Sequence, residues 1–535
     1  MGKKVQKPEV KSDMQAAAAN CNALPHFYRF LTALICCHFL LITSLSFLRF
    51  LTYKADFDVT EFNTAFWSLL HTGVPMIFYS PADAVNWFGA VHFSPVFYLL
   101  VPLYALWPSP FMLQIIHCAC LSGAAAPVAL ALRRLELGDK TILALIAMLL
   151  FNPFYFDTGL WEFHEVSIGC LLIACAYWAL LARHRTGFLL SLFLLLFTKE
   201  HFGLTVAGFG ALWWWRHRDG WFGFWVALAG LAAFYLVLEI IMPGLNNGLG
   251  HFMLQDGEMT RYAWLKGNAE NVLYNGIYLF FINDPHTIRG IGYLAVLFFT
   301  NGFLALLSPL YLLPGLSDLA TILLSAHYFP RSLSAYHSSS LVPALIIATG
   351  MTIAHYKKKL PEKLPLWVVL LAFTVGINIA LFSKNSITAY ELSNPSPVIN
   401  FQVADKIKSI IGKASVSAQS NIAFLFSSGP ATVYPFPANR ETSEFVALYL
   451  RHPYKHPYYF VWGDIYKLQP QQHYDAVLNL LENAPEWGIV LWDDNWLLLK
   501  KDTPDQLPVR QDIIRQLYSI PDRAQSAPLP TWTPF

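Results

Sequence analysis

Charge is scarce in this chain of 535 residues: 13% are Asp, Glu, Lys or Arg, whereas 55% are hydrophobic. Soluble proteins carry about 25% charged residues. A deficit of this size over such a length excludes an ordinary soluble protein and indicates that most residues face lipid or other apolar helices. Acidic and basic residues nearly balance, at a formal net charge of +2, so we expect no nucleic-acid partner.

Cysteine is also scarce, and the C-terminal third has none. Of the seven cysteines, all but Cys21 lie in apolar runs of the first third, and none shows the paired spacing of a zinc site. We interpret them as small apolar residues inside helices and expect no disulfide framework.

We expect no cleavable signal peptide at the N-terminus. Residues 1–26 are mostly polar and basic, and the apolar run from Phe27 to Leu51 is too long for a signal-peptide core. No small-residue cleavage site follows the run. We therefore expect a cytoplasmic N-terminus followed by a retained first span.

Long apolar runs are abundant. A helix that crosses a bilayer needs about 20 apolar residues. The runs predict an all-α polytopic bundle over residues 27–384 with about eleven spans, which are 28–51, 110–132, 141–156, 165–182, 187–199, 202–215, 221–242, 290–312, 316–329, 340–356 and 365–383. Segment 92–107 contains two prolines and is too short to cross, so we expect a re-entrant or surface-lying helix there.

The basic residues predict the orientation, because Lys and Arg accumulate in cytoplasmic loops. If 92–107 does not cross, every basic loop falls on one side: 3–11, 133–140, 183–185, 216–218 and 357–363. The other side, the outer face of a bacterial inner membrane, then receives 52–91, 157–164, 199–201, 243–289, 330–338 and everything after about residue 384.

Residues 385–535 have ordinary charge and short apolar runs, which indicates a small extracytoplasmic α/β domain. Helical spacing occurs at 403–412 and 473–484, and ASVSAQ, YYFVWG and GIVLW are typical of strands. Trp487–Lys501 predicts two strands around an Asp-Asp-Asn turn. We expect an extended tail at 527–535.

Ionisable groups at membrane depth are costly and usually mark a site. Five clusters of ionisable residues lie on the predicted outer face. The first cluster is acidic, and the second contains a histidine. Asp56 and Asp58 follow the first span, where one of them could act as a general base or the pair could simply begin a solvated loop. His92 precedes a proline-led helix, which favours an interfacial histidine over a ligand.

The third cluster offers two carboxylates and an imidazole within four residues. Helical spacing would place Glu162 and Glu165 on one face, where together with His164 they could share a divalent cation such as Mg²⁺ or Mn²⁺. Glutamates also suit the start of a helix electrostatically, so helix capping explains the pattern equally well.

The last two clusters carry cations suited to a phosphate. Lys199 with Glu200 lies between two apolar runs, and Arg331 precedes Tyr336 and His337. Lysine binds phosphate as a point charge and arginine binds it bidentately. The simpler interpretations are a local Lys–Glu pair and a polar turn.

These residues also carry a family resemblance. The sequence resembles an uncharacterised prokaryotic membrane-protein family, domain of unknown function 2079, in the order of Phe57-Asp58, His92–Pro95, Pro102–Tyr104, Phe163–Glu165, Lys199–His201, Tyr336–Ser338, Val416–Ala418 and Tyr434–Pro437. It departs from the pattern at Thr60, at the proline missing after His164, and at His201, which replaces an acid. We therefore assign the acidic role to Glu200.

The family is similar in layout to the GT-C integral-membrane glycosyltransferases. The resemblance implies inverting transfer of a sugar from a polyprenyl-phosphate donor to a glycan, lipid or protein acceptor at the outer leaflet. Asp58 would deprotonate the acceptor, with Glu162 and His164 beside it. Lys199 and Arg331 would stabilise the departing phosphate, and the substrate would also contact Asp56, His92, Glu165, Glu200, Tyr336 and His337.

Two other functions fit the sequence. One is a transporter or flippase of a lipid-linked envelope precursor, and the other is a scaffold that acts through its outer domain. Transporters usually place charge near the bilayer midplane and repeat internally. Here the charge gathers at one predicted face, which favours the enzyme.

Overall fold

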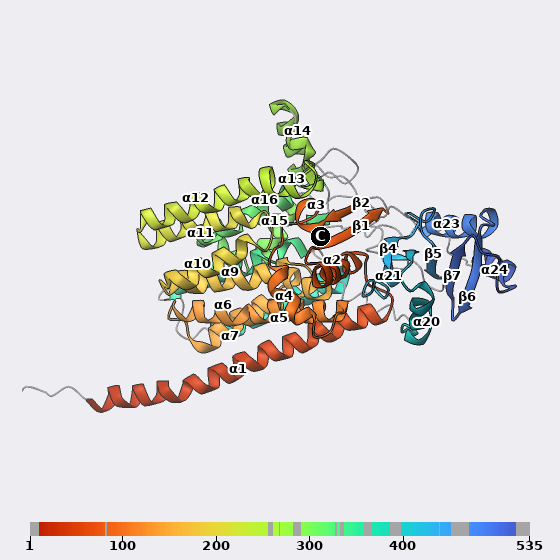
Figure 1. Ribbon diagram of the computed structural model, residues 1–535. Helices are drawn as coiled ribbons and strands as arrows, with labels where there is room; N and C mark the ends of the chain where they lie inside the picture. The colour runs from red at the N-terminus through yellow and green to blue at the C-terminus, as the bar shows by residue number, and fades with distance from the viewer. Residues whose placement is uncertain are drawn as a thin grey trace, which may run out of the picture.

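The computed structural model describes residues 10–80, 83–254, 261–266, 268–281, 290–326, 329–331, 336–357, 365–385, 397–437, 439–450 and 470–519. Helices predominate, and a small sheet forms beyond residue 400 (Figure 1). The predicted class, a helical bundle followed by a small α/β domain, is confirmed in this outline. The strand predicted at 458–463 and the tail at 527–535 lie outside the described residues.

Within the described ranges, three stretches are long and apolar enough to cross a bilayer. They are Pro25–Leu51 of helix α1 (Val10–Leu51), Pro110–Arg133 and Gly220–Leu245. The second comprises α5 (Pro110–Gly123) and α6 (Ala125–Arg133), and the third comprises α12 (Gly220–Leu236), η1 (Val237–Ile241) and α13 (Met242–Leu245). A fourth arises if α7 (Asp139–Leu150) and α8 (Pro153–Leu160), which are bent by 52°, form one span. Apart from 290–312, the other predicted spans remain predictions.

The outer helices expose apolar side chains. In an apolar 18-residue window of the α1 span only 22% is buried, and in one of the Gly220–Leu245 span only 17%. Trp221, Trp225 and Leu231 on α12 are exposed, as are Phe30 and Leu40 on α1. Apolar surface of this extent is unfavourable in water and favourable against lipid.

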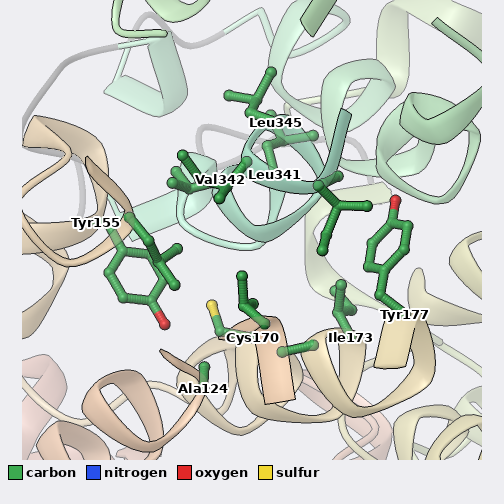
Figure 2. Close-up of a cluster of buried hydrophobic side chains, with 14 of the residues drawn as sticks. Ala124, Tyr155, Cys170, Ile173, Tyr177, Leu341, Val342 and Leu345 are labelled. Atoms are coloured by element: carbon green, nitrogen blue, oxygen red, sulfur yellow. The ribbon is translucent and has the colours of Figure 1, made fainter. Parts of the chain in front are cut away.

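Shorter helices fill the bundle: α9 (Val166–Leu181), α10 (Arg185–Leu196), α11 (Phe202–His217), α17 (Leu341–Tyr356) and α18 (Leu366–Asn385). Helix α14 (Ala269–Phe281) has no buried residue and projects away from the bundle (Figure 1). In the centre of the bundle, Cys170, Ile173 and Tyr177 of α9 face Leu341 and Val342 of α17 (Figure 2). Cysteines lie in α1, α5 and α9, and those whose side chains are described are free thiols: Cys36, Cys37, Cys118, Cys120, Cys170 and Cys175.

The prediction of one continuous span over 290–312 is wrong. Helix α15 (Gly290–Phe299) ends where Gly302 and Phe303 adopt left-handed backbone angles (φ 63° and 59°). Glycine favours such a break because it has no Cβ. The chain continues through η4 (Leu304–Leu307) and η5 (Pro309–Gly315) into α16 (Leu316–Leu323).

The bundle has two chemically different ends. Phe27 and Leu51 mark them on α1 and lie about 36 Å apart at 1.5 Å per residue. Arg133 stacks over the Phe27 ring at 4.7 Å, and Arg185 pairs with Asp219. We call this the basic end, made by the described loops 133–140, 183–185, 216–219 and Lys357. The opposite end, beyond Leu51, we call the site end.

Segment 92–107 begins and ends at the site end, as a non-crossing segment must. It follows α2 (Asp58–Thr72), the hairpin β1 (Met76–Ser80) and β2 (Asp83–Asn86), and α3 (Trp87–Ala90), and it contains only the short helix α4 (Phe97–Tyr104). Val96 N–H donates to the Phe197 carbonyl at 2.8 Å, and Phe111, just beyond, contacts Phe50.

The C-terminal domain confirms the predicted helices and hairpin. Its sheet has the order β4-β3-β5-β7-β6, in which β3 (Ser415–Ala418) pairs in parallel with β4 (Thr432–Pro435) and β5 (Phe445–Tyr449). The antiparallel hairpin is β6 (Trp487–Asp493) and β7 (Trp496–Lys501). Helices α20 (Phe401–Ile411), α21 (Ser420–Ala423), α23 (Pro470–Asn483) and α24 (Arg510–Tyr518) complete the domain.

This domain covers the site end (Figure 1). Tyr53, just after α1, stacks on Tyr449 of β5 with ring centroids 3.9 Å apart. Asn63 of α2 donates to the Ser427 hydroxyl at 2.9 Å. The contacts join the first loop after α1 to a domain more than 300 positions later in the chain and so fix the surroundings of Asp58.

Candidate functional site

The predicted site residues converge at the site end from five segments. The segments are the start of α2, the loop after α3, the loop between α8 and α9, the turn between α10 and α11, and the 3₁₀ turn η7 (Tyr336–Ser338). Each segment lies where a helix begins or ends. The helices therefore position the polar side chains at one end of the bundle, outside its apolar middle.

Asp58 and His164 form an acid–imidazole pair. Asp58 Oδ2 lies 3.5 Å from His164 Nε2. The other ring nitrogen, Nδ1, lies 2.8 Å from the Glu162 carbonyl oxygen. Since a carbonyl only accepts, Nδ1 carries the proton and donates, which leaves Nε2 facing the carboxylate. The Asp58 side chain is 15% exposed whereas His164 is buried, so a substrate can reach the carboxylate while the imidazole backs it.

Tyr336 packs against this pair. Its ring stacks on His164, with centroids 3.6 Å apart, and on His337 at 4.2 Å. The Lys199 ammonium lies 5.9 Å from the Tyr336 ring centre. The tyrosine therefore lies between the Asp58–His164 pair and the lysine.

Lys199 and Glu165 form a buried ion pair. Lys199 Nζ lies 2.7 Å from Glu165 Oε1, and Glu165 is fully buried. Burial by itself would raise the pKa of Glu165, but the Lys199 ammonium, with the imidazoles of His92 and His164, outweighs it and lowers the pKa to about 2. Glu165 is therefore an anion that balances the lysine.

Glu162 supports the loop that carries Asp56. Its Oε1 accepts the Asp56 N–H at 2.9 Å and lies 3.9 Å from Arg49 Nη2. Arg49 also donates to the carbonyls of Leu160 and Lys54. Burial raises the pKa of Glu162, and burial together with the Asp58 and Glu162 charges raises that of Asp56 well above its usual range. These two acids hold the frame around Asp58.

The structure does not bring Glu162, His164 and Glu165 together, so the cation site that the sequence suggested there stays a prediction. Their polar atoms point to three different partners: Glu162 to Arg49, His164 to Asp58 and Glu165 to Lys199. The reason is local. Helix α9 begins only at Val166, so residues 161–165 form a loop and do not share a helix face.

A different trio does converge. Glu200 Oε1 lies 3.2 Å from His92 Nδ1 and 3.5 Å from His251 Nε2, and Glu200 Oε2 accepts the Phe93 N–H at 3.2 Å. In the described part of the chain, these are the three His, Cys, Asp or Glu side chains whose ligand atoms approach within 4.8 Å of one another. Sequence reasoning found two of them but missed His251, which lies in a long segment without a recognised motif.

The trio lines a cavity of about 250 Å³. Lys199, Arg261, Tyr336 and His337 line its polar part, and Arg261 Nη1 lies 3.1 Å from His337 Nε2. Apolar side chains line the rest: Leu204, Phe234, Leu238, Leu254, Leu265 and Leu324. A cavity with cations at one part and an apolar wall at the other suits an amphiphile with an anionic head.

Arg331 does not line this cavity. It is buried and donates to the carbonyl oxygens of Ser325 at 2.8 Å and Ile322 at 3.3 Å. Arg261, which sequence reasoning missed, lines the cavity instead. His201 also lines the cavity, where its Nε2 lies 3.0 Å from Asp318 Oδ1.

Comparison with known proteins places the chain among membrane proteins. A family described as "Predicted membrane protein (DUF2079)" matches residues 50–498, which include all the site residues from Asp56 to His337 and most of the C-terminal sheet. A search of curated proteins gave no match.

Proposed function

Because the chain belongs to the DUF2079 family of predicted membrane proteins, we propose that it is a membrane enzyme of the GT-C type. It would transfer a sugar from a polyprenyl-phosphate donor to an acceptor hydroxyl. One observation carries the proposal: Asp58, His164 and Lys199 come together from separate segments beside an amphipathic cavity.

The cavity is the proposed donor site. Its apolar wall would hold the first part of a prenyl chain, and the Lys199 and Arg261 cations would bind the phosphate. A lipid-linked donor can enter sideways from the bilayer, past the exposed apolar side chains of α12. Cations fixed beside the phosphate stabilise the charge that develops as it departs.

Asp58 is the proposed general base. The acceptor oxygen attacks the anomeric carbon, the bond from that carbon to the phosphate oxygen breaks, and polyprenyl phosphate leaves with the electron pair. The hydroxyl proton passes to the Asp58 carboxylate, beside which His164 Nε2 is placed to share it. Attack opposite the leaving group inverts the anomeric configuration.

The acceptor would approach from beneath the C-terminal domain. Phe57 and Val59, on either side of Asp58, pack against that domain. Asp58 is not among the side chains that line the donor cavity, and Tyr336 lies between them. The transferred sugar would therefore rest beside the Tyr336 ring, between donor phosphate and base.

The orientation forms part of the proposal. The described basic loops gather at one end of the bundle, and Lys and Arg favour the cytoplasmic side. The site end and the C-terminal domain would then face the outside of a bacterial inner membrane.

The test is sugar transfer by protein purified in detergent. Wild-type protein is incubated with a panel of radiolabelled polyprenyl-phosphate sugars, and transfer to added lipid and glycan acceptors is measured. Asp58→Asn keeps the side-chain shape but removes the base, and we expect transfer to fall by about 10²–10⁴-fold. Asp139→Asn, a half-exposed acid at the basic end that pairs with Arg133, is the matched control and should transfer at the wild-type rate.

Two results would contradict the proposal. An Asp58→Asn enzyme with wild-type transfer would remove Asp58 from the chemistry. If the wild-type protein transfers no sugar from any donor but moves a labelled donor across proteoliposome membranes, the protein is a flippase.

A further inference from the structure

We propose that His92, Glu200 and His251 together bind one divalent metal ion, Zn²⁺, at the polar part of the cavity. The site differs from the cation site expected from the sequence, and none of its ligands takes part in the base chemistry proposed for Asp58. The proposal stands on geometry and does not depend on sugar transfer.

Two of the three separations between ligand atoms fit a tetrahedral ion, and all three are within 4.8 Å. Zinc binds histidine nitrogen and carboxylate oxygen at about 2.0–2.2 Å, so the ligands of a tetrahedral site lie about 3.3–3.5 Å from one another. Glu200 Oε1 lies 3.2 Å from His92 Nδ1 and 3.5 Å from His251 Nε2. Two histidines and one carboxylate form a recurrent zinc set that leaves a fourth position for water or substrate.

Both imidazoles point to the same carboxylate oxygen, Glu200 Oε1. His92 Nδ1 lies at hydrogen-bond distance from it, 3.2 Å, and His251 Nε2 lies 3.5 Å away. An ion bound by all three groups would occupy the point on which they converge.

The surroundings orient the ligands as a metal site requires. Glu200 Oε2 is held by the Phe93 N–H at 3.2 Å, which turns Oε1 toward the histidines. With His92 Nδ1 toward the ion, its Nε2 lies 3.9 Å from Glu165 Oε1, which is beyond hydrogen-bond distance. Glu165 therefore acts on the ring through its charge, which also balances the charge of Lys199.

All three ligands line the cavity, so the fourth position of the ion opens into it. Lys199 and Arg261 line the same cavity, and an anionic oxygen would therefore complete the coordination. If the proposed donor is correct, that oxygen belongs to its phosphate; this last assignment rests on the proposed function.

Metal binding is measured without any substrate. Wild-type protein is stripped with chelator, dialysed against buffered Zn²⁺ and analysed by mass spectrometry of the metal, with one Zn²⁺ per chain expected. Glu200→Gln and His251→Gln should bind Zn²⁺ at least about 100-fold more weakly, because even orienting partners contribute 10–100-fold. His201→Gln is the matched control, since His201 lines the same cavity and pairs with Asp318, and it should retain the ion.

X-ray absorption of the zinc-loaded wild type provides a second test that requires no variant to fold. Two imidazoles and oxygen ligands support the assignment. The proposal is overturned if the wild type retains no Zn²⁺, if Glu200→Gln and His251→Gln bind it as tightly as the wild type, or if the spectrum shows sulfur ligands or no imidazole. Zinc binding without sugar transfer would leave this site intact and remove only the proposed function.

Discussion

Replacing Lys199 by methionine should destabilise the protein by leaving the Glu165 carboxylate buried without its cation. Glu165 is fully buried, and its pKa lies at about 2 against an ordinary value of 4.5. At about 1.36 kcal/mol per pH unit, this difference corresponds to about 3 kcal/mol of stability at neutral pH. Removing one partner of a buried pair costs a similar amount, about 3–5 kcal/mol.

The assay is equilibrium unfolding of purified protein in mixed detergent micelles. We expect Lys199→Met to lower the free energy of unfolding by about 3–5 kcal/mol. The double variant Lys199→Met/Glu165→Gln, which removes the stranded charge, should recover most of this loss. Lys357→Met is the control: its ammonium lies 4.0 Å from Glu136 in an exposed pair at the basic end, and its loss should cost under about 1 kcal/mol.

The same variant has a signed pH dependence. In the wild type, the lowered pKa of Glu165 contributes stability that is complete above about pH 4.5 and is lost as the pH falls toward 2. Without Lys199, burial raises the pKa of Glu165, so the variant loses stability as the pH rises above 4.5. The gap between the two proteins should be smaller at pH 4 than at pH 7. A loss below about 1 kcal/mol at pH 7, or a double variant no more stable than the single one, would refute the reasoning.

Two further predictions concern packing and orientation. A Cβ on Gly210 of α11 would clash with the Ala227 backbone nitrogen of α12, so Gly210→Ala should destabilise the bundle by about 1–3 kcal/mol in the same unfolding assay. Gly376→Ala, where a Cβ meets nothing within 4 Å, should be neutral or stabilising. In intact cells, a membrane-impermeant maleimide should label the variant Ser409→Cys, which lies on the exposed face of α20. The same reagent should label Glu136→Cys only after the cells are permeabilised. The reverse pattern would show that the proposed orientation is inverted.

The bundle and the gathering of the site could be predicted from sequence because both depend on local or additive signals. Apolar runs identify helices that face lipid, and basic residues between them assign the loops to sides. Asp58, His164 and Lys199 were therefore expected on one side, and the structure places them around Tyr336. The hairpin at Trp487–Lys501 was equally local, since its turn residues lie between its strands.

The partner of each polar atom could not be predicted in this way. Glu162, His164 and Glu165 are neighbours in sequence, yet their side chains point to Arg49, Asp58 and Lys199 because a loop, not a helix, carries them. The break after Phe299 was likewise invisible to hydropathy, since the residues on both sides are equally apolar.

The order of apolar and basic segments thus determined that the chain forms a membrane bundle with its ionisable clusters at one end. Only the tertiary structure decided that His251 and Arg261 join the cavity and that Arg331 does not. The physical reason is the distance along the sequence over which each effect acts. Hydropathy acts residue by residue along the chain, whereas the direction of a buried polar side chain depends on contacts such as the one between His92 and Glu200, whose positions lie 108 residues apart.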